Sequence, residues 1–197
     1  MSKILKLNEI DNSFINAELE QGAVLCFVTD TVWGLGCLPE SEKGVDRIYE
    51  IKGRDRSKPL ILMSDKQEYL TKYFKTIPES AKNAMDSNFP GALTVICEKS
   101  DSCPDYLTSN MNTVGIRVPN NSVFASLCNK VKGHVLATTS ANKSGQPPVS
   151  SVEEALEKLD ADYIIDNEGQ MPEGISSTVA LFNSEGFKIL RQGSIVL

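Results

Sequence analysis

The sequence contains few of the residues from which metal and hydrolase sites are built. Its one histidine, His134, and five cysteines without a C-x-x-C pair offer no credible zinc site made of protein side chains. His134 lies in an apolar run, where a core histidine is more common than a catalytic base. The chain has no G-x-x-x-x-G-K-[ST] phosphate loop and no serine hydrolase elbow, and Gly34-Leu35-Gly36 lacks the third glycine of a dinucleotide fingerprint. We therefore expect no metal held by side chains. We also expect that the protein is not a P-loop protein, a serine hydrolase or a dinucleotide-binding enzyme.

Long hydrophobic runs and an excess of positive charge are also missing. No apolar run approaches the roughly 20 residues that span a bilayer, and the first residues turn polar too early for a secretory signal. The net charge of the 197 residues is −6, whereas proteins that bind nucleic acid without regard to sequence are usually basic. We expect one cytoplasmic domain over residues 1–197, with no membrane contact and with its five thiols reduced.

Against this acidic background, residues 51–61 (IKGRDRSKPLI) carry a local group of cations. They recur at every second position, at Lys52, Arg54, Arg56 and Lys58. Because Gly53 disfavours a helix and Pro59 favours an extended residue before it, we predict an extended strip with its cations along one face. One interpretation is a solvated basic loop. The other is a site for phosphates or carboxylates, and the acidic net charge favours a small anionic ligand over a long polyanion.

The hydrophobic pattern predicts a mixed α/β fold. Strands and helices are interspersed without strict alternation, which is typical of a mixed sheet with helices packed against it. We expect helices over 8–21, 41–51, 66–73, 78–87, 121–131 and 150–159, the last beginning with a capping box at Ser150 to Glu153. We expect strands over 23–28, 59–63, 92–97, 114–118, 134–138, 163–165, 178–182 and 187–191.

Several predicted strands end in segments rich in hydroxyl groups, amides or cations. These segments are TDTVWGLG after residue 28, KGRDRSKP from Lys52, TTSANKSG from Thr138 and SST at 176–178. Two arginines, Arg117 and Arg191, lie on strands, where a charge is costly unless it is paired or faces a cleft. Ser140 and Asn142 are two residues apart, so an extended chain would turn both to one side. Such a set fits a reaction that depends on neutralising phosphate charge and on positioning.

With these segments the chain resembles the YrdC-like family of L-threonylcarbamoyladenylate synthases. The matching stretches run in family order from about Gly22 to Ser194: TDTVWGLGC, IKGRDRSKPLIL, FPGALTVI, VGIRVPN, TSANKSGQPP, SSTVALF and ILRQGS. The resemblance implies a single α/β domain, with a twisted mixed sheet, flanking helices and a concave basic cavity. It also implies the short form of the family, without an additional C-terminal domain.

The resemblance further implies a reaction and a set of site residues. The reaction condenses L-threonine, bicarbonate and ATP, with Mg²⁺, to threonylcarbamoyl-AMP and pyrophosphate. A partner transferase then modifies the adenosine beside the anticodon of certain tRNAs, so a weak contact with tRNA is also expected. The family's K-x-R…S-x-N pattern falls on Lys52, Arg54, Ser140 and Asn142. Residues expected to hold threonine are Thr31, Met63 (a histidine in some members), Arg117, Thr138 and Ser177. Those expected to hold the nucleotide are Arg54, Lys58, Thr113, Ser140, Asn142 and Arg191.

Two alternatives remain at this point. The basic cavity of the same fold could serve an RNA-binding module for double-stranded RNA or tRNA, although the acidic net charge opposes this. A paralogue could keep the fold and act on another carbamoyl or acyl phosphate. The complete set of Lys52, Arg54, Ser140 and Asn142 favours the synthase over the paralogue.

Overall fold

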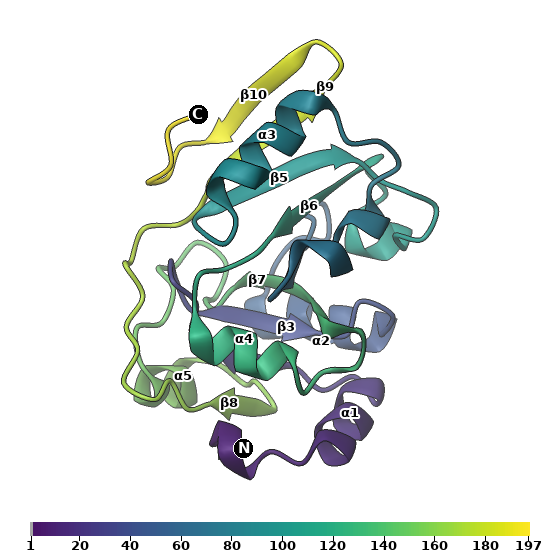
Figure 1. Cartoon of the computed structure of the whole chain (residues 1–197). Helices are drawn as coiled ribbons and strands as arrows, with labels where there is room; N and C mark the ends of the chain where they lie inside the picture. Colours follow the sequence, from purple (N-terminus) through teal and green to yellow (C-terminus); the bar gives the residue numbers. More distant parts are fainter. Residues whose placement is uncertain (1) are drawn as a thin grey trace.

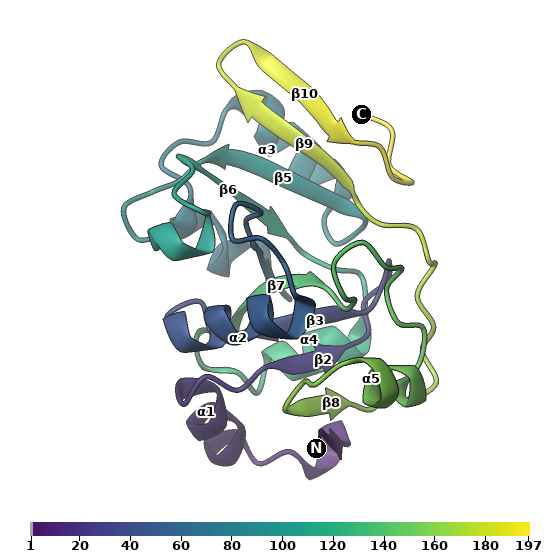
Figure 2. The ribbon, with the colours of Figure 1, turned by 180° about the vertical axis from the view of Figure 1, so that it is seen from behind.

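The computed structural model describes residues 2–197 and is built on one twisted sheet (Figures 1 and 2). Its ten strands lie in the order β1-β8-β2-β3-β7-β4-β6-β5-β9-β10. Their bounds are Lys3–Leu5 (β1), Leu25–Phe27 (β2), Gly34–Cys37 (β3), Ile61–Ser64 (β4), Leu93–Glu98 (β5), Thr113–Arg117 (β6), Val135–Ser140 (β7), Tyr163–Ile165 (β8), Thr178–Asn183 (β9) and Gly186–Arg191 (β10). The sheet contains both parallel pairs, such as β4–β6, and antiparallel pairs, such as β4–β7, which confirms the predicted mixed sheet.

Helices cover both faces of the sheet. They are α1 (Asn12–Glu20), α2 (Glu42–Lys52), α3 (Glu79–Asn88), α4 (Ser122–Cys128) and α5 (Val152–Lys158). In Figure 1, α3 and α4 lie in front of the sheet, whereas Figure 2 brings α2 and α5 to the front. Short 3₁₀ turns occupy Leu7–Glu9, Gln67–Tyr69, Thr71–Tyr73, Asp105–Leu107 and Lys132–His134. None of the helices in residues 2–197 has the length and hydrophobicity needed to cross a bilayer.

Local chemistry explains where the helices begin and end. The side chains of Asp11, Ser41, Asn121 and Ser151 accept hydrogen bonds from backbone N–H groups of the first turn. At α5 the Ser151 hydroxyl accepts from Glu154 N, while the Glu154 carboxylate accepts from Ser150 N. The N-cap is therefore Ser151, one residue later than predicted, and the carboxylate of Glu154 binds the residue before the cap instead of the cap itself. Helix α2 ends at Gly53, whose φ of 55° is favourable for glycine.

The cationic strip predicted over 52–58 is wrong. Helix α2 continues up to Gly53, so Lys52 is its last residue instead of the first residue of an extended strip. The Lys52 side chain is buried. Arg56 turns back to Asp46, with 2.6 Å between Nη2 and Oδ1, and its guanidinium lies 5.4 Å from the centre of the Tyr49 ring. Only Arg54 of these cations lines the main pocket, and Lys58 is exposed.

Four further segments differ from the sequence-based expectation. The GLGC segment, for which no strand was predicted, is strand β3, and Lys3–Leu5 adds the edge strand β1. The helix predicted over 66–73 consists of two 3₁₀ turns. His134 precedes β7 instead of lying inside it, and its ring stacks on Tyr69 with 4.5 Å between ring centres. All five cysteines are unpaired and buried.

Candidate functional site

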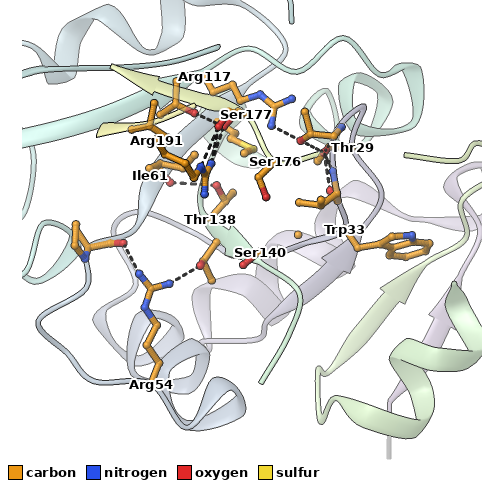
Figure 3. Close-up of a pocket in the computed structure, with 18 residues that line it drawn as sticks. Thr29, Trp33, Arg54, Ile61, Arg117, Thr138, Ser140, Ser176, Ser177 and Arg191 are labelled. Atoms are coloured by element: carbon orange, nitrogen blue, oxygen red, sulfur yellow. Dashed lines mark hydrogen bonds between the residues drawn. The ribbon is translucent and has the colours of Figure 1, made fainter. Parts of the chain in front are cut away.

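A cavity of about 220 Å³ lies over the middle of the sheet, where β3, β7, β4 and β6 are neighbours. Loops from distant parts of the sequence complete its walls (Figure 3). The lining residues are Thr29, Thr31, Val32, Trp33, Gly34, Arg54, Pro59, Ile61, Met63, Thr94, Arg117, Thr138, Thr139, Ser140, Ser176, Ser177, Val179 and Arg191. This list contains three arginines and eight hydroxyl side chains but no acidic residue of the described chain, so the cavity is suited to an anion.

Arg117 is the most buried cation of the pocket. It ends β6 with 2% of its surface exposed. Its Nε donates to Gly91 O at 2.9 Å, its Nη1 to Thr31 Oγ1 at 2.6 Å, and its Nη2 to the Asp30 carboxylate. Burial lowers the pKa of Arg117, and Asp30 opposes this shift. Two guanidinium hydrogens remain after these three bonds, so a ligand carboxylate could still bind here.

The turn that holds Thr31 is fixed by its own hydroxyl groups. Thr29 Oγ1 donates to Val32 O at 2.6 Å and accepts from Thr31 N at 3.2 Å. The segment before β9 adds backbone bonds to this turn, from Glu173 N to Asp30 O at 2.9 Å and from Gly174 N to Thr31 O at 2.8 Å. This turn therefore presents Thr31 and Arg117 to the cavity as one preorganised unit.

Arg54 approaches the cavity from the opposite side to Arg117 and Arg191 (Figure 3). Its Nη1 donates to Thr139 Oγ1 at 2.6 Å and its Nη2 to Pro59 O at 3.2 Å, while the buried Nε has no partner. Burial lowers the pKa of Arg54 below its usual value, so an anion in the cavity would compensate a partly desolvated cation.

The hydroxyl of Ser177, directly before β9, links residues of β5 and β10, the two strands on either side of β9. Arg191 Nη2 donates to Ser177 O at 2.9 Å and to Ser177 Oγ at 3.1 Å, and Ser177 Oγ lies 2.8 Å from Thr94 Oγ1. Thr94 belongs to β5, which pairs with β9 directly after Ser177. Arg191 thus has two functions in this geometry, because it lines the pocket and also fixes the start of β9.

Lys52 and Asn142 lie behind the pocket wall instead of in it. Lys52 Nζ donates to Ser140 O at 2.5 Å and to Asn142 O at 2.9 Å. Ser140 Oγ, which belongs to a lining residue, donates to Asn142 Oδ1 at 2.6 Å. Burial and the nearby Arg54 lower the pKa of Lys52 to about 7.

Comparison with known proteins identifies the family. A family model for Sua5, YciO and YrdC proteins, described as telomere recombination, matches residues 17–193. Threonylcarbamoyl-AMP synthase of Halorhodospira halophila is 35% identical over 138 residues, which are 70% of this chain and 72% of that protein. The chain belongs to the Sua5/YciO/YrdC family.

Solved structures of this family have the same fold. Pyrococcus abyssi Sua5 complexed with L-threonine superposes with a TM-score of 0.86 at 30% identity, and the match includes 99% of this chain but only 58% of Sua5. Escherichia coli YciO has a TM-score of 0.83 at 26% identity, with 98% of this chain and 97% of YciO matched. The chain therefore spans somewhat more than half of that Sua5 and nearly the full length of YciO.

The structure brings most of the residues predicted from the family resemblance to one pocket. Those in its wall are Thr31, Arg54, Met63, Arg117, Thr138, Ser140, Ser177 and Arg191. Lys52 and Asn142 are directly behind this wall, and Lys58 follows Arg54 in an exposed loop. Thr113 begins β6, four residues before Arg117, and lines a different cavity with Glu98 and Phe182. Its assignment to the nucleotide therefore rests on the family resemblance alone.

Sequence reasoning missed the partners that orient these side chains. Asp30, Thr94 and Thr139 are hydrogen-bonded to Arg117, Ser177 and Arg54 respectively. Asp30 could have been suspected, because a strand-borne arginine needs a counter-charge and this aspartate lies in a predicted site loop. Thr139 lies in the hydroxyl-rich segment TTSANKSG but was not singled out from it. Thr94 gave no signal, since β5 reaches Ser177 only through the order of the strands.

Proposed function

We propose that this protein is a threonylcarbamoyl-AMP synthase that acts in the cytoplasm on L-threonine, bicarbonate and ATP. The observation that carries the proposal is the pocket, in which three arginines and many hydroxyl groups converge without an acidic residue of the described chain. Such a lining suits several anionic groups at once, namely a carboxylate, a carbamate and phosphates. The similarity to proteins named threonylcarbamoyl-AMP synthase, at 33–37% identity in three of these relatives, supports this choice of substrates.

In this proposal threonine binds between Thr31 and the central strands. Arg117 would receive the carboxylate on its two free hydrogens, while Thr138 and Ser177 offer hydroxyl groups at the cavity wall. Met63 lies beside both Leu136 and Arg117 in the sheet, so it would contact the threonine side chain near the carboxylate. An apolar contact with a methyl group discriminates against serine by only about 1–3 kcal/mol.

The phosphates of ATP would lie toward Arg54, with Ser140, Lys58 and Arg191 as further contacts. No group of three or more His, Cys, Asp or Glu side chains in residues 2–197 could hold a metal ion. The hydroxyl and guanidinium lining fits a Mg²⁺ ion that is held by the phosphates and water, since the lining itself offers no anionic ligand. When bound, Mg²⁺ would neutralise phosphate charge.

The proposed chemistry has two steps. The amine of threonine attacks the carbon of bicarbonate and releases water, which gives a carbamate. A carbamate oxygen then attacks the α-phosphorus of ATP, and the bond to the β-phosphate breaks as pyrophosphate leaves. Arg54 would stabilise the charge that develops at the α-phosphate, and the fixed Thr31–Arg117 unit would hold the nucleophile in line. The product is then available to a partner transferase that modifies tRNA.

The test is chromatographic product analysis with ATP, Mg²⁺, bicarbonate and labelled L-threonine. We expect threonylcarbamoyl-AMP and pyrophosphate, and no product when any substrate is left out. Arg54→Ala should lower kcat/KM by a factor of about 10²–10³, as expected for the loss of one preorganised donor. Arg56→Ala is the matched control, because Arg56 is paired with Asp46 outside the pocket, and it should retain wild-type turnover.

The same experiment examines the paralogue alternative. Pyrophosphate release at full rate without threonine, or ADP and inorganic phosphate as the only products, would refute adenylation of a threonine carbamate. A paralogue that acts on another carbamoyl or acyl phosphate would then be the better explanation.

A further inference from the structure

Lys52 is enclosed by oxygen atoms that belong to one segment of the chain. Its Nζ lies 2.5 Å from Ser140 O, 2.9 Å from Asn142 O and 3.1 Å from Asn142 Oδ1. In its protonated form the Lys52 side chain has three hydrogens and no acceptor, so these three contacts use the whole hydrogen-bonding capacity of that form. Only 2% of the Lys52 surface is exposed, and the residue is absent from the pocket wall.

The same segment is also attached to the last carbonyl groups of α2. Lys143 Nζ donates to Ile51 O at 2.5 Å, and Ser144 N donates to Lys52 O at 2.8 Å. The final carbonyl groups of a helix lack partners within it, and cations are favourable at that end. We call these four residues, Ile51, Lys52, Lys143 and Ser144, the α2 clamp.

Asn142 is engaged in a similar way. Its Oδ1 accepts from Lys52 Nζ and from Ser140 Oγ, and its Nδ2 donates to Lys143 O at 2.8 Å and to Gln146 O at 2.9 Å. Both amide hydrogens and the amide oxygen are therefore occupied within the chain. Of the K-x-R…S-x-N residues, only Arg54 and Ser140 face the cavity.

We propose that Lys52 is a positioning residue that holds the end of β7 against α2, and that it is not a phosphate ligand. The effect of Lys52 on turnover that we infer rests on the proposed function, whereas its effect on the structure does not. The α2 clamp fixes the backbone at Ser140 and, through Asn142, the Ser140 hydroxyl. Arg54 comes directly after Gly53, the C-cap of α2. Because the α2 clamp joins this end of α2 to the end of β7, it also sets the distance between Arg54 and Ser140 across the pocket.

The test combines amide hydrogen exchange with steady-state kinetics on the full chain. Without substrates, Lys52→Met should accelerate exchange of the Ser144 and Gln146 amides at least ~10-fold, because local opening becomes easier. Turnover should fall by about 10²-fold, as expected for a displaced catalytic group. Arg56→Met, which removes a cation from the loop that follows α2, should change neither readout. Lys52→Met combined with Asn142→Ala should lose no more activity than the worse single variant, since both act on one segment.

A direct phosphate contact predicts the opposite pattern. Exchange over residues 140–146 would stay at the wild-type rate in Lys52→Met, and the losses from Lys52→Met and Asn142→Ala would multiply; this result overturns the inference. If Lys52→Met does not fold, Lys143→Met removes another contact of the clamp and should accelerate the same amides. An inactive wild-type protein whose exchange still responds to Lys52→Met would refute the proposed function but not the positioning role.

Discussion

At the scale of single residues, the ion pair between Asp30 and Arg117 links stability to the site. The two side chains are 14% and 2% exposed, so removal of the carboxylate would leave a buried cation without its counter-charge. We predict that Asp30→Ala lowers the free energy of unfolding by about 3–5 kcal/mol. Glu20→Ala, which breaks the exposed pair with Lys132, should cost at most about 1 kcal/mol. Urea denaturation of both variants provides the measurement, and equal losses would contradict the prediction.

A second residue-scale prediction concerns pH. Folding lowers the pKa of Lys52 from 10.5 to about 7. The unfolded chain therefore binds more protons between these two values, and the contribution of Lys52 to the free energy of unfolding rises as the pH rises through this range. Lys52→Met removes this dependence. Between pH 6.5 and 9.5, the stability of wild type relative to Lys52→Met should increase by at least about 1 kcal/mol, measured by urea denaturation. A difference that does not change with pH would argue against a depressed pKa.

Some of these residues could be predicted and others could not. Arg117 was recognisable because a charge inside an apolar strand needs a partner or a cleft, and the structure provides both. The burial of Lys52 was not recognisable. The alternation of cations suggested an extended chain, but α2 continues for one residue beyond Ile51 and turns Lys52 toward the end of β7.

At the scale of elements, β3 shows why a glycine-rich segment was mistaken for a loop. The side chains packed around β3 leave no room for a Cβ atom at Gly36, which would lie 2.8 Å from Phe27 Cε1 and 3.4 Å from Leu136 Cβ. A Cβ atom at Gly34 would be tightly packed, 3.0 Å from Phe27 Cε2. The glycines serve packing between neighbouring strands, which sequence patterns do not reveal. Helix α2 was predicted within one residue at each end, because Ser41 and Gly53 provide local start and stop signals.

This packing leads to a prediction for β3. Gly36→Ala should lower the free energy of unfolding by about 1–3 kcal/mol, because the added methyl group forces the buried Phe27 ring to move. Phe27→Leu should relieve the overlap, so the loss in the double variant should be smaller than the sum of the two single losses. Denaturant unfolding of the four proteins completes the cycle. Strict additivity would show that the Phe27 ring does not restrict this position.

At the scale of the whole molecule, the sheet assembles the site from segments that are far apart in the sequence. The order β3-β7-β4-β6 places residues of the first, second and third quarters of the chain side by side, and β9 and β10 add Ser177 and Arg191. Periodicity predicted most of these strands but contained no information on their order. Only the resemblance to a family indicated that the separate polar segments meet in one pocket.

The distribution of charge over the whole molecule predicts weak binding to RNA. Many surface cations are already paired, such as Arg47 with Asp160, Lys75 with Glu98 and Lys132 with Glu20, and the net charge is −6. Paired cations and a negative net charge both oppose the counterion release on which tight binding to a duplex depends. Fluorescence anisotropy with labelled double-stranded RNA at ~0.15 M salt should detect no nanomolar binding, and Arg54→Ala should not alter the signal. Nanomolar affinity with a steep salt dependence, lost in Arg54→Ala, would instead mean that the arginine pocket is an RNA-binding site.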